Sequence, residues 1–291
     1  MKNQNANAEK VTAAGLDVLG QAPARSIAED VPGPVSHVEP ASDEAHVLIE
    51  RLFGGTQQQI PGMRYAIAYR AANGQSGGDI ADVFRYDNDH VSFLIADIAG
   101  KGSAAASQAA MVKYGLRTLA SAGLMPESVM RALNRLYFES ITFENVPESF
   151  ATVFFGIIDT TRRFLFYSNA GHEPVLIIFP DGKHIVLDPT GPLIGVFGDQ
   201  HHLFKQSTIE LPVGTLLVAG TDGVTETRGR DGDFYGVDRF VACALKNREA
   251  SESDIAQTLL AEVNTFSASR QRDDVAIIVS RFSHGAPPNA G

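Results

Sequence analysis

Two consecutive helical segments in an otherwise strand-rich chain limit the folds that this sequence can adopt. Residues 103–122 are rich in alanine and end at Gly123, and residues 127–140 begin after Pro126 with one apolar face. Three short alternating segments precede them and predict β strands, namely MRYAIAYR, DIADVFRY and HVSFLIAD. This order differs from the regular strand–helix alternation of a parallel sheet.

The second half of the chain is a longer run of predicted strands. Turn signals separate the segments FATVFFGIID, RFLFYSNA, PVLIIF, HIVLD, LFKQSTIEL and TLLVAG. Two more helices are predicted near residues 237–246 and 252–266, and the strand VAIIVSRF follows them. The sequence therefore predicts an α+β fold in which helices pack on antiparallel sheets.

The N-terminal residues differ in character from the rest. Residues 1–41 contain four prolines and few large apolar residues, so we expect a flexible tail. Residues 42–55 predict a helix that Ser42 caps and that carries an apolar stripe from Ala45 to Phe53. This stripe is consistent either with packing on its own domain or with a regulatory, dimerising role. Residues 284–291 are expected to form a disordered C-terminal tail.

The amino-acid composition limits which kinds of partner the protein can bind and in which cellular compartment it is expected. The chain has 34 acidic and 24 basic residues, a net charge of −10, which disfavours nucleic acid as a partner. Cys243 is the only cysteine, so neither an intrachain disulfide nor a cysteine zinc site is expected. No long apolar run predicts a membrane helix or a signal peptide. These features fit a cytoplasmic protein that does not associate with membranes.

The most informative residues are aspartates at the ends of predicted strands. Asp79 follows two glycines in GGDIADV, and Asp97 ends a strand in FLIADIAGKG. Asp222 follows a strand in LLVAGTDGV, and Asp273 precedes the last strand in RDDVAIIV. Each aspartate alone is typical of a turn or a cap. Four of them on neighbouring strands could instead point their carboxylates into one cleft.

Clustered carboxylates imply a cation. Close carboxylates repel one another unless a positive charge neutralises them. A set of oxygen ligands without a Cys/His cluster favours Mg²⁺ or Mn²⁺ over zinc. Two such ions can activate a water and clamp a phosphoryl group, which is the chemistry of phosphate-ester hydrolysis.

The ordered set of motifs resembles the SpoIIE-type, RsbU-like bacterial branch of the metal-dependent protein phosphatase 2C (PPM) superfamily. The similar elements are GGDIADV, DIAGKGSAAA, NAGHEPVLI, GTDGVTET and RDDVAIIV, and they extend over about residues 45–283. The resemblance implies a phosphatase domain at residues 56–283. It also implies a β-sandwich of two antiparallel sheets flanked by helices, an α-β-β-α arrangement.

The resemblance assigns roles to individual positions and implies two bound ions, Mn²⁺ or Mg²⁺. Asp79 and Asp97 would be shared metal ligands, and the backbone carbonyl of Ile98 would complete one site. Asp222 and Asp273 would hold the other ion. Two further residues are implied near the site: Asp274 beside the ligands, and Asp82 in a supporting position.

Three positions depart from the pattern of the superfamily, namely Lys101, Ala99 and Ala276, the last of which replaces a frequent threonine. Lys101 stands where this branch often has histidine, and it is consistent either with a phosphate contact or with an exposed lysine. Ala99 stands where the eukaryotic members have a histidine proposed as general acid. His172 is an alternative acid, although a histidine in a Gly-His-x-Pro turn more often has a structural role.

The function implied is hydrolysis of phosphoserine or phosphothreonine on a partner protein. The resemblance suggests a STAS-type anti-sigma factor antagonist as the substrate, with activation by a separate protein or by homodimerisation. One alternative is a catalytically weak or inactive pseudo-phosphatase that serves as a binding scaffold. A nucleotide-hydrolysing metalloenzyme is a third hypothesis, but the chain lacks a GxxxxGK[ST] loop.

Overall fold

The computed structural model describes residues 60–71, 78–85, 87–100, 102–143, 149–198, 201–267 and 273–283. The predicted tails at 1–41 and 284–291, the predicted helix at 42–55 and Lys101 lie outside these residues. Within them, the strands form two antiparallel sheets of five strands each. This confirms the predicted sandwich.

The two sheets are built from strands that are far apart in the sequence. Sheet A has the order β1-β10-β9-β6-β7, and sheet B has the order β2-β3-β4-β5-β8. The strands of sheet A are β1 (Met63–Arg70), β10 (Val275–Phe282), β9 (Leu216–Gly220), β6 (Val175–Ile178) and β7 (His184–Val186). Those of sheet B are β2 (Ile80–Arg85), β3 (His90–Ile98), β4 (Ala151–Asp159), β5 (Phe164–Ala170) and β8 (Ser207–Glu210).

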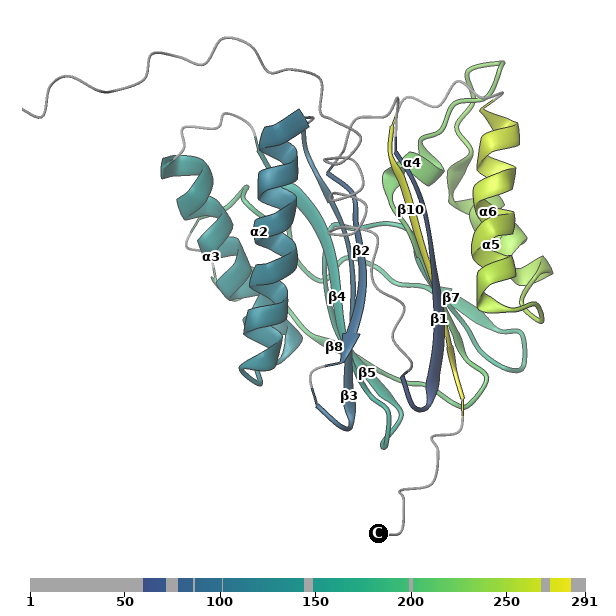
Figure 1. Cartoon of the computed structure of the whole chain (residues 1–291), viewed down its shortest axis with the longest axis horizontal. Coiled ribbons are helices and arrows are strands. Elements are labelled where there is room, and N and C mark those ends of the chain that lie inside the picture. Colours follow the sequence, from purple (N-terminus) through teal and green to yellow (C-terminus); the bar gives the residue numbers. More distant parts are fainter. Residues whose placement is uncertain are drawn as a thin grey trace, which may run out of the picture. The chain divides into compact units, whose positions relative to one another are not determined.

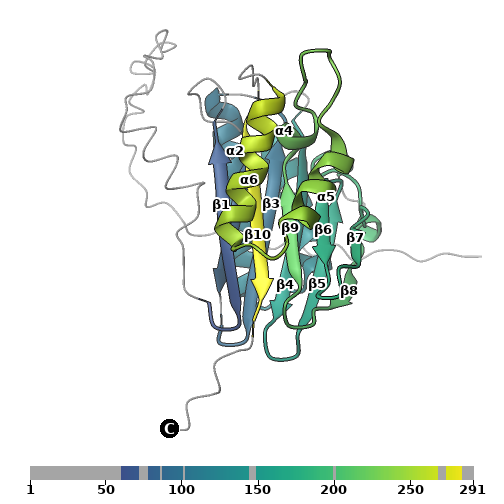
Figure 2. The same cartoon turned by 90° about the vertical axis from the view of Figure 1, so that its right-hand side faces the viewer.

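Helices cover the outer face of each sheet (Figures 1 and 2). The long helices α2 (Gly102–Ser121) and α3 (Pro126–Phe143) lie on sheet B, whereas α5 (Gly236–Lys246) and α6 (Glu252–Phe266) lie on sheet A. The short helix α4 (Asp222–Thr225) directly follows β9, and a 3₁₀ turn, η1, spans His201–Leu203. The layers are therefore helix, sheet, sheet and helix, as predicted.

Alternation along the strands distributes apolar side chains between these layers. In β3, Phe93 and Ile95 belong to the core between the sheets, whereas Leu94 and Ala96 belong to the core beneath α2 and α3. A third core joins sheet A to α5 and α6. Full burial of each large apolar side chain contributes about 1.5–3 kcal/mol. Both faces of the sheets are thus covered, which explains why most strands have few polar positions.

Two predictions of secondary structure differ from the observed elements. The segment LFKQSTIEL forms a strand only over Ser207–Glu210, because Leu203 belongs to the 3₁₀ turn and residues 204–206 connect that turn to the strand. The sequence TDGV reads as a simple turn, but Asp222–Thr225 forms α4. Among the described residues, no helix has the length and apolar content needed to cross a bilayer.

Candidate metal centre

Asp79 and Asp97 come together because of the register of β2 and β3. Ile80 pairs with Ala96, so one residue further along each strand Asp79 lies beside Asp97. Since side chains alternate between faces, both carboxylates share the face of Ala81 and Ile95, which is turned toward sheet A. The two carboxyl groups are close enough for the charge of Asp97 to raise the pKa of Asp79.

A glycine permits the close approach of the strands at this point. A Cβ atom on Gly78 would lie 2.4 Å from the carbonyl oxygen of Ile98. Any side chain would therefore push apart the two segments that carry Asp79 and Asp97. The same close approach puts the carbonyl of Ile98, a predicted ligand, beside the backbone of Gly78, the residue before Asp79.

Sheet A supplies the other acidic side chains. β9 ends at Gly220, and Asp222 begins α4 immediately afterwards; Asp273 and Asp274 directly precede β10. A Cβ atom on Gly223 would lie 1.7 Å from the carbonyl oxygen of Asp274. Gly223 is therefore required for backbone contact between the two acidic segments rather than for a turn alone.

The acidic groups of the two sheets interact with one another. Burial and then the neighbouring Asp97 raise the pKa of Asp79 well above its usual range. Burial, followed by repulsion from Asp97 and Asp273, raises the pKa of Asp222 to about 7. Burial also raises the pKa of Asp97, with Asp273, Asp274 and Glu226 adding to the effect. We name this set the carboxylate cluster: Asp79, Asp97, Asp222, Glu226, Asp273 and Asp274.

The donor chemistry of the carboxylate cluster fits a hard divalent cation. All its side-chain donors are oxygens, and the mutual repulsion that raises their pKa values is the repulsion that a cation removes. Within the described part of the chain, no three or more His, Cys, Asp or Glu side chains are arranged so that together they could hold a metal ion. A bound cation would reduce the repulsion between these carboxylates and allow them to move closer together.

Asp82 lies away from the carboxylate cluster. It is three residues beyond Asp79, so alternation turns it to the opposite face of sheet B. There it is fully buried and accepts two hydrogen bonds from Arg117 of α2, at 2.7 and 2.8 Å. Lys113 lies 3.8 Å away and completes the ion pairing. Asp82 therefore attaches α2 to β2 instead of supporting the candidate ligands.

His172 occupies a buried turn. Its Nδ1 lies 2.8 Å from the Thr152 hydroxyl, and its backbone is held by two hydrogen bonds with the Asn169 side chain. Burial lowers the pKa of His172 to about 3, so the ring is neutral at pH 7. A neutral ring at that pKa is unsuited to act as a general acid, which agrees with the structural interpretation.

The sequence motifs do not indicate three residues at the candidate centre: Glu226 of the carboxylate cluster and two hydroxyl residues that bond to the cluster, Tyr69 and Thr221. Glu226 lies one helical turn after Asp222 and raises the pKa of both Asp97 and Asp222. The Tyr69 hydroxyl donates to Asp274 Oδ2 at 3.2 Å, and the Thr221 hydroxyl donates to Asp79 Oδ2 at 2.6 Å. The i, i+4 spacing could have revealed Glu226, whereas the two hydroxyl contacts join segments more than 140 residues apart.

A cavity of about 360 Å³ adjoins the carboxylate cluster. Asp222, Glu226 and Asp273 line one part of it, and the turn that carries Arg228 and Arg230 lines another. Arg228 stacks on Phe234 with its guanidinium 4.2 Å from the ring centre. The candidate centre is thus open to a ligand from this side.

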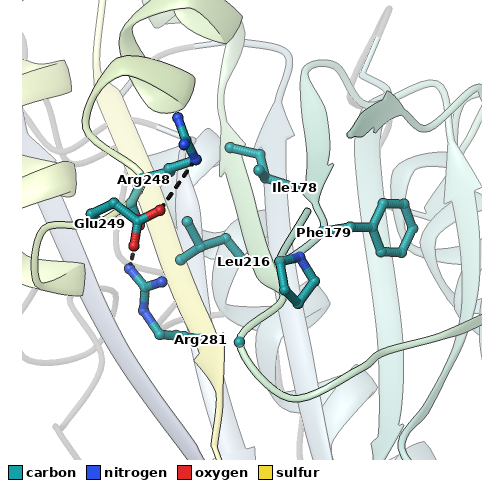
Figure 3. A pocket seen from close by; sticks show the side chains of 8 residues that line it. Ile178, Phe179, Leu216, Arg248, Glu249 and Arg281 are labelled. Atoms are coloured by element: carbon teal, nitrogen blue, oxygen red, sulfur yellow. Dashed lines mark hydrogen bonds and ion pairs between the residues drawn. The ribbon is translucent and has the colours of Figure 1, made fainter. Parts of the chain in front are cut away.

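A second cavity, of about 130 Å³, lies at the opposite end of sheet A (Figure 3). Its cationic side chains already have partners, because Arg248 pairs with Glu249 at 3.2 Å and Arg281 donates to the Arg248 carbonyl at 2.7 Å. It contains none of the predicted site residues. Its lining consists of Ile178, Phe179, Pro180, Gly214, Leu216, Arg248, Glu249 and Arg281.

Curated proteins with sequence similarity to this chain include IcfG and RsbU. Protein IcfG of Synechocystis sp. is 28% identical over 225 residues, which cover 69% of this chain and 35% of IcfG. Phosphoserine phosphatase RsbU of Bacillus subtilis is 32% identical over 151 residues, which cover 51% of this chain and 43% of RsbU. The chain thus spans less than half the length of these relatives.

Structural and family comparisons extend the similarity. The crystal structure of the RsbU and RsbW domains of Rv1364c from Mycobacterium tuberculosis superposes with a TM-score of 0.66 and 26% identity, covering 78% of this chain and 62% of that one. The family described as Stage II sporulation protein E (SpoIIE) matches residues 87–283, which include Asp97, Asp222 and Asp273. Because this match covers well over half of the sequence, the chain belongs to the SpoIIE family.

Proposed function

We propose that this chain is a metal-dependent protein serine/threonine phosphatase with its catalytic centre in the carboxylate cluster. The observation that carries the proposal is the convergence of Asp79 and Asp97 from sheet B with Asp222 and Asp273 from sheet A. Family membership supports it, as does the description of RsbU as a phosphoserine phosphatase.

Each part of the proposed centre has its own task. Asp79 and Asp97 would be shared ligands, the Ile98 carbonyl would complete one ion site, and Asp222 and Asp273 would hold the second ion, with Asp274 beside them. When bound, Mn²⁺ or Mg²⁺ would supply a water of lowered pKa and would neutralise the charge of a phosphoryl group. The cavity beside Asp222 and Glu226 admits the phosphorylated side chain. Because the pKa of His172 is about 3, the proton for the leaving serine oxygen comes from water.

The proposed substrate is a phosphoserine or phosphothreonine on a partner protein. A STAS-type anti-sigma factor antagonist is our specific proposal, by analogy with the RsbU-type relatives. Activation by a second protein or by homodimerisation belongs to the same proposal. The alternative of an inactive scaffold is less favourable, since all four candidate ligand aspartates are present.

The test is release of phosphate from p-nitrophenyl phosphate by the full chain, in Mn²⁺, in Mg²⁺ and in EDTA. We expect turnover that requires a divalent ion and that Asp222→Asn abolishes. Asp181→Asn is the matched control, because Asp181 also precedes a glycine but is exposed on the turn after β6 and pairs with Lys183.

The same assay on a phosphorylated antagonist protein tests the substrate. A folded chain that hydrolyses neither substrate in any metal, even at high enzyme concentration, would favour the scaffold. Turnover that Asp222→Asn leaves intact would place the chemistry outside the carboxylate cluster.

A further inference from the structure

Thr221 connects the two sheets beneath the carboxylate cluster. It is fully buried, and its backbone N–H donates to the carbonyl of Ala276 in the adjacent strand at 3.0 Å. Its hydroxyl accepts from the Ala276 N–H at 3.0 Å and donates to Asp79 Oδ2 at 2.6 Å. One side chain of the sheet A layer thus holds a carboxylate of sheet B.

The start of α4 explains why the hydroxyl takes this position. The Thr221 carbonyl turns away from the sheet and accepts the Val224 N–H at 2.9 Å. The hydroxyl then replaces that carbonyl as the acceptor for Ala276. A threonine at a helix N-cap usually accepts an N–H of the first turn, but here the side chain makes no such bond. Helix capping therefore does not account for Thr221.

The direction of the two hydrogen bonds is fixed by chemistry. A backbone N–H can only donate, so the Thr221 oxygen is the acceptor from Ala276 and its single proton points to Asp79. The Asp79 oxygen that receives this proton must be an acceptor. The Thr221 hydroxyl oxygen lies 2.6 Å from this Asp79 oxygen, which is within hydrogen-bond distance.

We propose that Thr221 is a positioning residue that holds the Asp79 carboxylate in one orientation for the metal. It occupies Oδ2 of Asp79 and leaves the other oxygen for an ion. It also fixes the distance between the sheet that carries Asp79 and the segment that carries Asp222. This inference rests on the proposed function, since it assigns Asp79 as a metal ligand.

The test compares Mn²⁺ binding by variants of the full chain freed of metal. Thr221→Val keeps the shape and removes both hydrogen bonds, whereas Thr221→Ser keeps the hydroxyl. Partners that orient metal ligands typically account for 10–100-fold in affinity. By isothermal titration calorimetry we expect Thr221→Val to weaken Mn²⁺ binding at least about tenfold, and Thr221→Ser to remain within about twofold of the wild type.

Thr215→Val is the matched control. Thr215 lies just before the other end of β9 and is equally buried, and its hydroxyl makes no hydrogen bond within the described residues. We expect this variant to bind Mn²⁺ as the wild type does. Thr221→Ala, which is smaller than the native residue, replaces Thr221→Val if the valine variant does not fold.

The outcomes separate this inference from the proposed function. A Thr221→Val variant with a lower melting temperature but wild-type Mn²⁺ affinity would show that Thr221 is only structural. Loss of affinity in both Thr221→Val and Thr221→Ser would also overturn the role of the hydroxyl. If the wild type binds no Mn²⁺ and hydrolyses no phosphate ester, the proposed function itself fails and the inference fails with it.

Discussion

Asp79 and Asp82 lie three residues apart on the same edge of sheet B, and both are buried, but their surroundings are opposite. Asp82 faces α2, where Arg117 and Lys113 neutralise it. Asp79 faces sheet A, where its neighbours Asp97, Asp222 and Asp274 are acidic and raise its pKa. The chain supplies the counter-charge for Asp82 on one face of the strand, whereas on the other face the proposed cation would supply it for Asp79.

This difference separates a structural carboxylate from a functional one. A buried carboxylate with its own cationic partners holds elements together and gains nothing from an added metal ion. A buried cluster of like charges destabilises the fold until a cation binds. The following experiments test whether the two aspartates differ in this way.

The largest expected effect is that of Asp79→Asn on turnover. Loss of a carboxylate ligand should lower Mn²⁺-dependent hydrolysis about 1000-fold, which corresponds to about 4 kcal/mol. The metal-free variant should be at least as stable as the wild type, because a repelling charge has been removed. Steady-state kinetics and urea unfolding measure the two effects. A stable variant that retains full turnover would contradict the assignment of Asp79.

Asp82→Asn should have the opposite effects from Asp79→Asn: a loss of stability with little change in metal binding. Breaking a buried ion pair leaves Lys113 without its full counter-charge and costs about 3 kcal/mol of unfolding free energy. We expect a matching fall in the urea midpoint and near-normal Mn²⁺ affinity in the protein that remains folded. A selective loss of Mn²⁺ affinity at unchanged stability would return Asp82 to the group of site residues.

Metal addition should stabilise only a protein with an intact carboxylate cluster. At a Mn²⁺ concentration 100 times the dissociation constant, binding to the folded state contributes about 2.7 kcal/mol. Thermal unfolding should show this gain for the wild type and for Thr215→Val, and little of it for Asp79→Asn. Equal stabilisation of all three proteins would mean that Mn²⁺ binds elsewhere.

The pH dependence of stability gives a smaller effect, in metal-free protein. The pKa of Asp222 is raised from 3.8 to about 7, so the folded state binds more protons than the unfolded state between these values. Stability from this group is therefore lost as the pH rises from about 4 to about 7. We expect a change of about 2 kcal/mol, after allowance for the partial exposure of Asp222.

The variant Asp222→Asn separates the contribution of Asp222 to the pH dependence of stability from that of His172. The pKa of His172 is lowered from 6.5 to about 3, so its contribution has the opposite sign and is lost as the pH falls. The difference in unfolding free energy between the wild type and Asp222→Asn, measured from pH 4 to pH 7, removes the histidine term. A difference that does not vary with pH would contradict the raised pKa of Asp222.

The sequence predicts the sheets well because alternation and turns are local signals. MRYAIAYR and VAIIVSRF form β1 and β10 with the predicted limits, and the predicted helix at 252–266 matches α6. The position of Asp82 was also available from the sequence, since residues three apart on one strand face opposite sides. The resemblance to the family, in contrast, predicts that Asp82 lies in a supporting position near the metal ligands.

Other features depend on tertiary structure. The contact between Thr221 and Asp79 spans 142 residues and joins two layers, so no local pattern indicates it. Helix α4 has only four residues and forms because the chain leaves the sheet at Thr221. The pKa values of the carboxylate cluster likewise arise from burial and neighbours that only the packed sandwich brings together.

The close contact between Gly223 and Asp274 determines which residue of the Asp-Gly pair would distinguish a catalytically inactive homologue from an active one. A Cβ atom at position 223 would meet backbone, and no change in a neighbouring side chain can relieve that collision. A lineage that lost catalysis but kept the fold would therefore be expected to retain Gly223. Asp222 has no such steric constraint and could drift freely. In related sequences, loss of the aspartate of the Asp-Gly pair would therefore indicate loss of catalysis. Retention of the glycine would indicate only that the fold is retained.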